Sequence, residues 1–183
     1  MKKIMKGILL CIVFVAGILM TRFTMYNIMP SSFPTELNLK TIDGHTIDRD
    51  DLMGETTLVV FWATTCASCI KEIPHLIALY EELNHSGLKI VAVAMAYDPP
   101  KRVIDFSKRN NLPYSIALDV DGSAARLLGN ITITPTTLLI DEHGNIIERY
   151  VGLIDFAKLK DKIKTLLVTT IASSSSLSNY ALV

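Results

Sequence analysis

The chain has 183 residues, of which 50% are hydrophobic, and this suits one folded domain with additional terminal segments. Lysine and arginine together number 18, as do aspartate and glutamate, so the formal net charge is zero. A chain without a basic excess lacks the electrostatic footprint of a nucleic-acid-binding protein, and we expect no nucleic-acid partner.

The N-terminus carries Lys2, Lys3 and Lys6, followed by an uncharged apolar run over residues 7–20. Counted from Ile4 to Met20, the run is near the lower limit of length for a membrane-spanning helix. The basic flank predicts that the N-terminus stays in the cytoplasm and that the rest of the chain is exported. We therefore predict that residues 1–32 form a single-pass anchor and spacer in the bacterial cytoplasmic (inner) membrane, which places the remainder in the periplasm. A cleaved signal peptide is the alternative, although no Ala-x-Ala site follows the run.

The predicted folded domain covers residues 33–167 and begins with a short hairpin over residues 37–46. The tight-turn pair Asp43-Gly44 lies there between two alternating segments. Short apolar runs then predict strands at residues 58–61, 89–96, 115–118, 136–140 and 146–151. Helical spacing of apolar residues predicts helices between several of these strands and a last helix over residues 156–167. This alternation indicates an α/β sheet with helices on both faces.

Two stretches depart from the regular pattern of strands and helices. Asp98 precedes Pro99 and Pro100, and an aspartate followed by proline is typical of a helix start, so we expect Asp98 to be an N-cap. Residues 168–183 lose the helical spacing and include four consecutive serines. Their composition predicts a flexible tail, to which we assign no function.

Cys66 and Cys69 lie three residues apart, between the strand at residues 58–61 and the helix that follows. Residues i and i+3 are neighbours on a helical turn, so the two sulfurs can close a short disulfide ring. This motif at a strand-to-helix junction is typical of a thioredoxin-like redox site. An inert disulfide and half of a zinc site are the alternatives, but zinc needs four ligands and the sequence has no second cysteine pair. We predict a redox dithiol without a metal or other cofactor.

The position of Cys66 predicts that it is the nucleophile of the pair. Unpaired N–H groups and the macrodipole at a helix start favour negative charge, which lowers the pKa of a thiol and maintains part of it as reactive thiolate. Cys66 would attack a partner disulfide and form a mixed disulfide. Cys69 would then resolve that intermediate.

Three motifs carry a resemblance to a known family. They are residues 62–69, which contain both cysteines, residues 71–74, which contain Glu72, and residues 134–141, which begin with Thr134-Pro135. Together they resemble the TlpA/ResA family of membrane-anchored, thioredoxin-like thiol:disulfide oxidoreductases of bacteria. The resemblance covers the predicted domain and implies a thioredoxin-like fold, with a central mixed sheet flanked by helices and an N-terminal β-hairpin extension.

The resemblance also implies roles for four residues outside the cysteine pair. Pro135 matches a cis-proline in a loop that faces the cysteines, and the backbone of Thr134 would pair with the substrate chain. Trp62 would pack beside the site and contribute to substrate binding. Glu72 matches an active-site glutamate that moves protons to and from Cys69. Read without the resemblance, these residues are an ordinary trans proline, a core tryptophan and a solvated surface glutamate.

The function implied by the resemblance is the reduction of disulfides in partner proteins. The expected substrates are apocytochrome c or a copper-delivery protein for oxidase assembly, and the expected electron donor is a membrane thiol transporter of the DsbD/CcdA type. Ala67-Ser68 between the cysteines differs from the Gly-Pro of thioredoxin. Because that dipeptide affects the reduction potential, a disulfide oxidase or isomerase of the same fold is the alternative.

A copper-binding chaperone is an alternative from another class, in which Cys66 and Cys69 would hold Cu(I) as soft ligands. Met95 and His75 are conceivable additional ligands, but they are more simply a strand-core residue and a helix-surface residue. A peroxidase is disfavoured, because Ala63 occupies the threonine position of the Thr-x-x-Cys pattern of peroxiredoxins.

Overall fold

The computed structural model describes residues 13–18 and 30–180, and the chain divides into two compact units, Met1–Pro30 and Ser31–Val183. In the first unit the structure describes a helical stretch at residues 13–18 and Pro30 at the boundary. The prediction of a single-pass membrane anchor needs correction, because no helix among the described residues is long and apolar enough to cross a membrane. Most of the apolar run behind that prediction, residues 7–20, lies outside the described residues. The predicted bilayer contact and periplasmic location depended on the anchor and are withdrawn with it.

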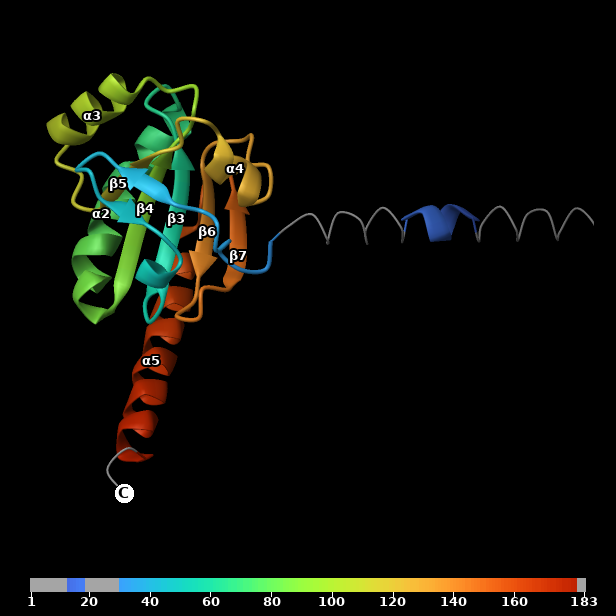
Figure 1. The fold of residues 1–183 in the computed structure, drawn as a ribbon, viewed down its shortest axis with the longest axis vertical. Coiled ribbons are helices and arrows are strands. Elements are labelled where there is room, and N and C mark those ends of the chain that lie inside the picture. Colours follow the sequence, from blue (N-terminus) through green and yellow to red (C-terminus); the bar gives the residue numbers. More distant parts are fainter. Residues whose placement is uncertain (1–12, 19–29, 181–183) are drawn as a thin grey trace, which may run out of the picture. The chain divides into compact units, whose positions relative to one another are not determined.

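The second unit is built on one mixed sheet of seven strands, in the order β2-β1-β5-β4-β3-β6-β7 (Figure 1). The strands are β1 (Leu39–Thr41), β2 (Thr46–Ile47), β3 (Thr56–Trp62), β4 (Leu88–Ala94), β5 (Ser115–Leu118), β6 (Thr136–Ile140) and β7 (Ile146–Val151). The central strands β3, β4 and β5 are parallel, whereas β6 and β7 on one side and β1 and β2 on the other are added in antiparallel pairs. The strands predicted from the apolar runs are therefore confirmed.

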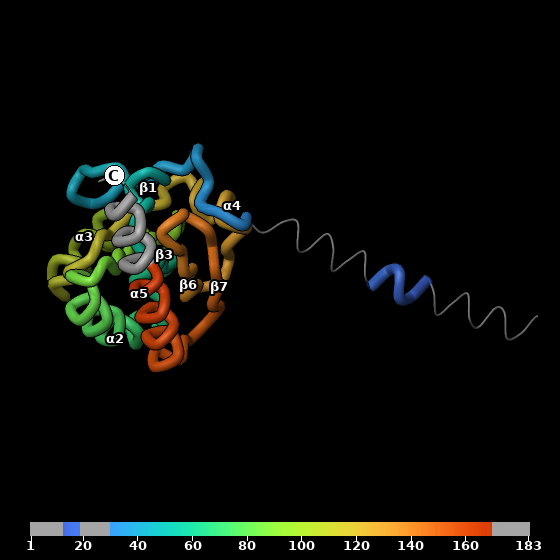
Figure 2. Tube along the Cα trace, turned by 90° about the horizontal axis from the view of Figure 1, so that it is seen from below, coloured from blue at the N-terminus to red at the C-terminus, as the bar shows by residue number. Residues whose placement is uncertain are grey.

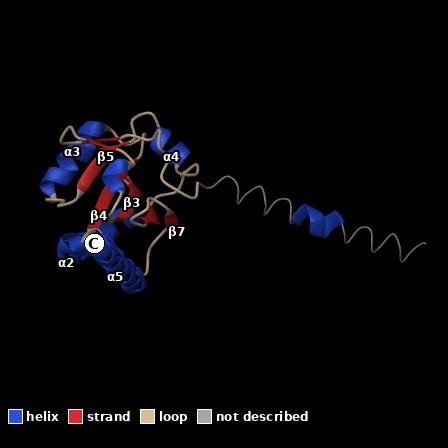
Figure 3. Ribbon diagram, turned by 60° about the horizontal axis from the view of Figure 1, so that its bottom comes forward, coloured by secondary structure: helices blue, strands red, loops and turns tan. Residues whose placement is uncertain are grey.

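Helices pack against this sheet and cover two separate cores. The helices are α2 (Ala67–Leu83), α3 (Pro100–Arg109), α4 (Ser123–Leu127) and α5 (Phe156–Tyr180), with short 3₁₀ turns at Asp50–Leu52 and Asn84–Ser86. Helices α2, α3 and α5 contribute to the core on one face, where Figures 2 and 3 show α2 and α5 side by side. Helix α4 contributes to the core on the other face.

Strand β3 supplies side chains to both cores, because successive residues of a strand point to opposite faces of the sheet. Leu58, Val60 and Trp62 belong to the core under α2 and α5. Val59 and Phe61 belong to the core under α4. Burial on both faces explains why this strand is a continuous apolar run rather than an alternating one.

Helix α5 extends beyond residue 167, where we expected regular structure to end, and continues to Tyr180. The stretch 168–180 contains neither proline nor glycine, so its sequence includes no strong helix breaker. The hydroxyls of Thr165 and Thr169 donate to the backbone carbonyls four residues earlier, at 3.0 and 2.7 Å. Such bonds to the preceding turn are compatible with a continuous helix.

Candidate active site

The strand register brings four loop segments to one edge of the sheet. Trp62 at the end of β3 pairs with Ala94 at the end of β4. Phe61 pairs with Thr136 at the start of β6, which in turn pairs with Val151 at the end of β7. The segments that follow β3, β4 and β7 therefore meet the segment that precedes β6, and these four segments contain the cysteines and Pro135.

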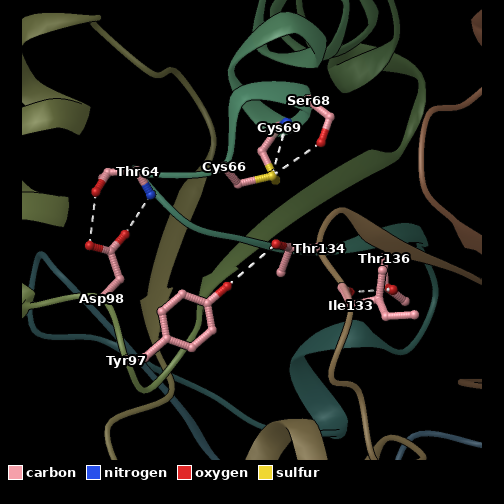
Figure 4. Close-up of a disulfide and its surroundings, with 9 residues drawn as sticks. All are labelled: Thr64, Cys66, Ser68, Cys69, Tyr97, Asp98, Ile133, Thr134 and Thr136. Atoms are coloured by element: carbon pink, nitrogen blue, oxygen red, sulfur yellow. Dashed lines mark hydrogen bonds between the residues drawn. A yellow bond between two sulfur atoms is a disulfide. The ribbon is translucent and has the colours of Figure 1, made fainter.

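A disulfide joins Cys66 and Cys69 at the start of α2, with 5.2 Å between their Cα atoms (Figure 4). Cys66 is the N-cap residue of the helix, and its Sγ accepts the backbone N–H of Cys69 at 3.1 Å. The Ser68 hydroxyl lies 3.3 Å from the same sulfur. After reduction, these groups are placed to stabilise a thiolate on Cys66, together with the helix N-terminus.

The two cysteines differ in their access to solvent. Cys66 is partly exposed, whereas Cys69 is buried in the core between the sheet and α2. A partner protein can therefore reach the sulfur of Cys66 but not that of Cys69. This asymmetry agrees with the predicted order of attack, first by Cys66 on the partner and then by Cys69 on the mixed disulfide.

The peptide bond between Thr134 and Pro135 is cis, which confirms the conformation implied by the family resemblance. Thr134 lies in the loop before β6, and none of the hydrogen bonds among the described residues uses its backbone N–H or C=O. The Pro135 carbonyl accepts the N–H of Gly152 at 2.8 Å. The Thr134 backbone is therefore free to pair with an extended segment of another chain.

Glu72 is buried, although the sequence without the family resemblance indicates a surface residue. Its side chain is 3% exposed, and Oε1 accepts the backbone N–H of Ile154 at 2.8 Å. Oε2 is buried and has no hydrogen-bond partner among the described residues. Burial raises the pKa of Glu72, and this effect exceeds the opposing effects of the Ile154 N–H and of the charge on His75. A carboxyl group with a raised pKa holds its proton to higher pH than an ordinary glutamate does.

Trp62 lies beneath the site rather than on its surface. Its ring is buried in the same core as Cys69 and lies 5.5 Å from the ring of Phe106, centroid to centroid. A buried ring offers little area to a partner chain, so the structure places Trp62 as packing support for the disulfide. The contribution of Trp62 to substrate binding that the resemblance implied stays a prediction.

Asp98 occupies a position that sequence reasoning missed. It is not the N-cap of α3, because Pro99 is the cap residue and makes no side-chain capping bond. Its buried carboxylate instead accepts the backbone N–H of Thr64 at 2.5 Å and the Thr64 hydroxyl at 2.8 Å (Figure 4). Asp98 thus holds the turn that leads to Cys66. The available signal was its place in the loop after β4, the parallel neighbour of β3.

Exposed apolar side chains lie in the loops at the same edge of the sheet as the disulfide. Tyr97 in the loop after β4 is 60% exposed, and its hydroxyl lies 3.4 Å from the Thr134 hydroxyl (Figure 4). Ile133 in the loop before β6 and Leu153 after β7 are also more than half exposed. Exposed apolar groups that gather at one place on a protein mark a surface for a partner.

The conceivable additional copper ligands do not join the cysteines. Met95 is buried in the core under α4, and the His75 ring stacks on Phe156 at 5.0 Å between centroids. In residues 13–18 and 30–180, no group of three or more His, Cys, Asp or Glu side chains is arranged to hold a metal ion. A copper site would therefore depend on the two sulfurs of Cys66 and Cys69.

Comparison with known proteins places this geometry in a family. Residues 32–149 match the AhpC/TSA family. The thiol-disulfide oxidoreductase ResA of Halalkalibacterium halodurans is 35% identical over 114 residues, which cover 62% of this chain and 64% of that protein. The sporulation thiol-disulfide oxidoreductase A of Bacillus subtilis is 31% identical over 130 residues, which cover 70% of this chain and 78% of that protein.

The crystal structure of StoA from Bacillus subtilis has the same fold, with a TM-score of 0.60 and 29% identity over 70% of this chain and 98% of that one. The match to the ResA of Halalkalibacterium halodurans spans less than two thirds of that protein's length. The family match nevertheless covers more than half of this chain. The chain therefore belongs to the AhpC/TSA family, in which it is similar to the thioredoxin-like thiol-disulfide oxidoreductases ResA and StoA.

Proposed function

We propose that this protein is a thiol:disulfide oxidoreductase that reduces disulfides in partner proteins. The observation that carries the proposal is the asymmetric disulfide at the start of α2, in which Cys66 is accessible and Cys69 is buried. The names of the relatives support the reaction class. The free backbone of Thr134 beside the cis proline supports a polypeptide substrate.

The reaction proceeds in two exchanges that balance in electrons and protons. The Cys66 thiolate attacks one sulfur of the partner disulfide, which breaks that bond, forms a mixed disulfide and releases the first partner thiolate. Cys69 then loses its proton and attacks the Cys66 sulfur. This step forms the Cys66–Cys69 disulfide and releases the second partner thiolate. The dithiol has supplied two electrons. The two partner thiolates take up two protons, which balance the proton that Cys66 lost on ionisation and the proton that leaves Cys69 in the resolving step.

Glu72 is the group that we assign to the proton of Cys69. It lies three residues after Cys69 on α2, which is the same side of the helix. In the resolving step the ionised carboxylate accepts the proton of Cys69, and in the reverse step the neutral carboxyl returns it. Its unpaired Oε2 is the oxygen available for that proton.

A second dithiol must re-reduce the Cys66–Cys69 disulfide after each turnover. We retain a thiol transporter of the DsbD/CcdA type as the candidate donor, and apocytochrome c or a copper-delivery protein as candidate substrates. The exposed apolar side chains Tyr97, Ile133 and Leu153 favour partners with an unfolded or extended segment next to the disulfide.

The direction of electron flow is tested by the reduction potential of the Cys66–Cys69 couple, measured by equilibration with glutathione. A value close to that of thioredoxin, roughly −270 mV, supports a reductase. A value near that of DsbA, roughly −120 mV, would make the protein an oxidase of its partners. Cys66→Ser should abolish exchange with a protein disulfide, whereas Cys69→Ser should accumulate the mixed disulfide.

The role of Glu72 is tested by the pH dependence of disulfide exchange in Glu72→Gln. We expect the pH profile of the resolving step to change shape, because glutamine cannot take up the proton of Cys69. The rate of the first attack by Cys66 should change much less. An unaltered profile for the resolving step would remove Glu72 from the mechanism.

A further inference from the structure

A short segment after β7 makes backbone hydrogen bonds both to the loop that contains Pro135 and to the carboxylate of Glu72. At its first residue, the N–H of Gly152 donates to the carbonyl of Pro135 at 2.8 Å. Two residues later, the N–H of Ile154 donates to Oε1 of Glu72 at 2.8 Å. Residues 152–154, here called the bridge segment, therefore span from the loop that carries Thr134 to the buried carboxylate on α2.

The middle residue of the bridge segment faces solvent. Leu153 is 65% exposed, and it lies directly between the two residues that make the bonds. A partner chain that pairs with the Thr134 backbone must lie beside Pro135, whose carbonyl is held by Gly152. The docked chain would therefore press on the same three residues that position the carboxylate of Glu72.

We propose that the bridge segment is a positioning element that couples partner docking at the Thr134–Pro135 loop to the protonation of Glu72. The proposal rests on the proposed function, in which Glu72 holds the proton of Cys69. The physical basis is the stiffness of the connection. Three residues have few soft dihedral angles, so a displacement of Gly152 moves the N–H of Ile154 relative to Oε1 of Glu72.

The hydrogen bond from Ile154 favours the ionised form of Glu72, whereas burial favours the neutral form. Movement of Ile154 away from Oε1 therefore raises the affinity of Glu72 for a proton. Among the nearby charged side chains, His75 on the same helix favours the ionised form. Asp155, which follows the bridge segment, is paired with Lys158 at 3.4 Å.

Gly152 allows a direct test, because its φ of +85° is a conformation that side chains with a Cβ rarely adopt, and an added Cβ would meet no atom within 4 Å. Gly152→Ala therefore disturbs the backbone without creating a clash, while Gly152→Asn is the matched control, since asparagine tolerates this region better than alanine. In the reduced full chain, the pH titration of the Glu72 carboxyl carbon by NMR should shift upward in Gly152→Ala. The shift in Gly152→Asn should be smaller.

The coupling to docking is tested in the Cys69→Ser variant, in which one of two groups is attached to Cys66 through a disulfide. One is an extended peptide, and the other is a methylthio group that fills the sulfur position without reaching Pro135. The Glu72 midpoint should lie higher with the peptide than with the methylthio group. In the Gly152→Ala background this difference should shrink, because the bridge segment no longer transmits the contact.

Three results would overturn the proposal: equal Glu72 midpoints in the wild type and Gly152→Ala, equal shifts in the alanine and asparagine variants, or a peptide effect undiminished by Gly152→Ala. If Gly152→Ala does not fold, the proposal can still be tested on the wild type. The chemical shifts of the Ile154 and Gly152 amide protons should both change with pH at the midpoint of Glu72, and these changes should be absent in Glu72→Gln. A Gly152 amide whose chemical shift does not follow the Glu72 midpoint would contradict the coupling. Because these readouts follow the carboxyl and the amides directly, they are independent of whether Glu72 carries the proton in catalysis.

Discussion

Two buried carboxylates lie close to the disulfide, and they differ in how many of their oxygens accept hydrogen bonds. Asp98 bonds to the turn before Cys66, and Glu72 lies on the helix that carries Cys69. Asp98 is 4% exposed and Glu72 is 3% exposed. Both oxygens of Asp98 accept hydrogen bonds from Thr64. Only one oxygen of Glu72 accepts a bond, from the N–H of Ile154, and the other has no partner among the described residues.

This difference indicates separate roles for two groups of the same chemistry. A buried carboxyl group whose two oxygens both accept hydrogen bonds holds its surroundings in place, and its loss leaves the donors unpaired. A buried carboxylate with a free oxygen can take up a proton without breaking a bond. We therefore assign Asp98 to positioning of the turn before Cys66, whereas the free oxygen of Glu72 is compatible with the proton transfer that we propose for it.

The largest effect should follow the removal of the Asp98 carboxylate. Asp98→Ala leaves the N–H and the hydroxyl of Thr64 without their partner, and we expect a loss of about 3 kcal/mol in the free energy of unfolding. Chemical denaturation at neutral pH measures this loss. Asp98→Asn is the control, because an amide can accept from the Thr64 N–H and donate to its hydroxyl, and it should retain most of the stability. Equal losses in both variants would assign the effect to charge rather than to the paired bonds.

The next effect should depend on pH and concern Glu72. Because burial raises the pKa of Glu72 in the folded state above its ordinary value of 4.5, the folded state binds this proton more tightly than the unfolded chain does. The resulting stabilisation is complete below the unfolded-state pKa and is lost as pH rises through the raised pKa. The stability of the wild type relative to Glu72→Gln should therefore fall over that range. Denaturation curves for both proteins at several pH values measure it, and a constant difference would contradict the raised pKa.

A smaller effect should follow the removal of the Thr64 hydroxyl. Thr64→Val preserves the shape of the side chain and the backbone N–H but deletes one of the two bonds to Asp98, at an expected loss of about 1–2 kcal/mol. Thr64→Ser retains the hydroxyl and should lose less. Thermal unfolding of the two variants measures the difference. If serine and valine were equally destabilising, the hydroxyl bond would not contribute.

The smallest effect should come from the Tyr97 hydroxyl. Its distance of 3.4 Å from the Thr134 hydroxyl is long for a hydrogen bond, so Tyr97→Phe should change the free energy of unfolding by less than about 0.5 kcal/mol. Tyr97→Ala also removes the exposed ring and should raise KM for a protein disulfide more than Tyr97→Phe does. Steady-state reduction of a protein disulfide distinguishes the two, and equal KM values would remove the ring from the partner surface.

Sequence reasoning succeeded where a feature depends on residues that are neighbours in the chain. Short apolar runs located the central strands, because each is buried on both faces and its composition reflects that burial directly. The motif of Cys66 and Cys69 at a strand-to-helix junction indicated the redox pair before any contact was known. The family resemblance, rather than any local pattern, pointed to Glu72 and to the cis bond at Pro135.

Sequence reasoning was less successful where local patterns have two meanings. An aspartate before two prolines is typical of a helix cap, yet Asp98 instead bonds to Thr64. The serine-rich stretch after residue 167 indicated a flexible tail, yet α5 continues to Tyr180. The apolar N-terminal run indicated a membrane anchor, but the described residues include no helix able to span a membrane. Trp62 was expected to pack beside the site and to contribute to substrate binding, and the structure shows only the packing, in the core that contains Cys69.

The sequence by itself determined the chemistry of this protein, because the cysteine spacing and the alternation of apolar strands with helices are properties of neighbouring residues. Only the tertiary structure decided which acidic side chains are paired. The partner of Asp98 is 34 residues away in the chain, and the partner of Glu72 is 82 residues away. Contacts at such separations arise from strand register and helix packing, and they set the burial and the hydrogen bonds by which Asp98 and Glu72 differ.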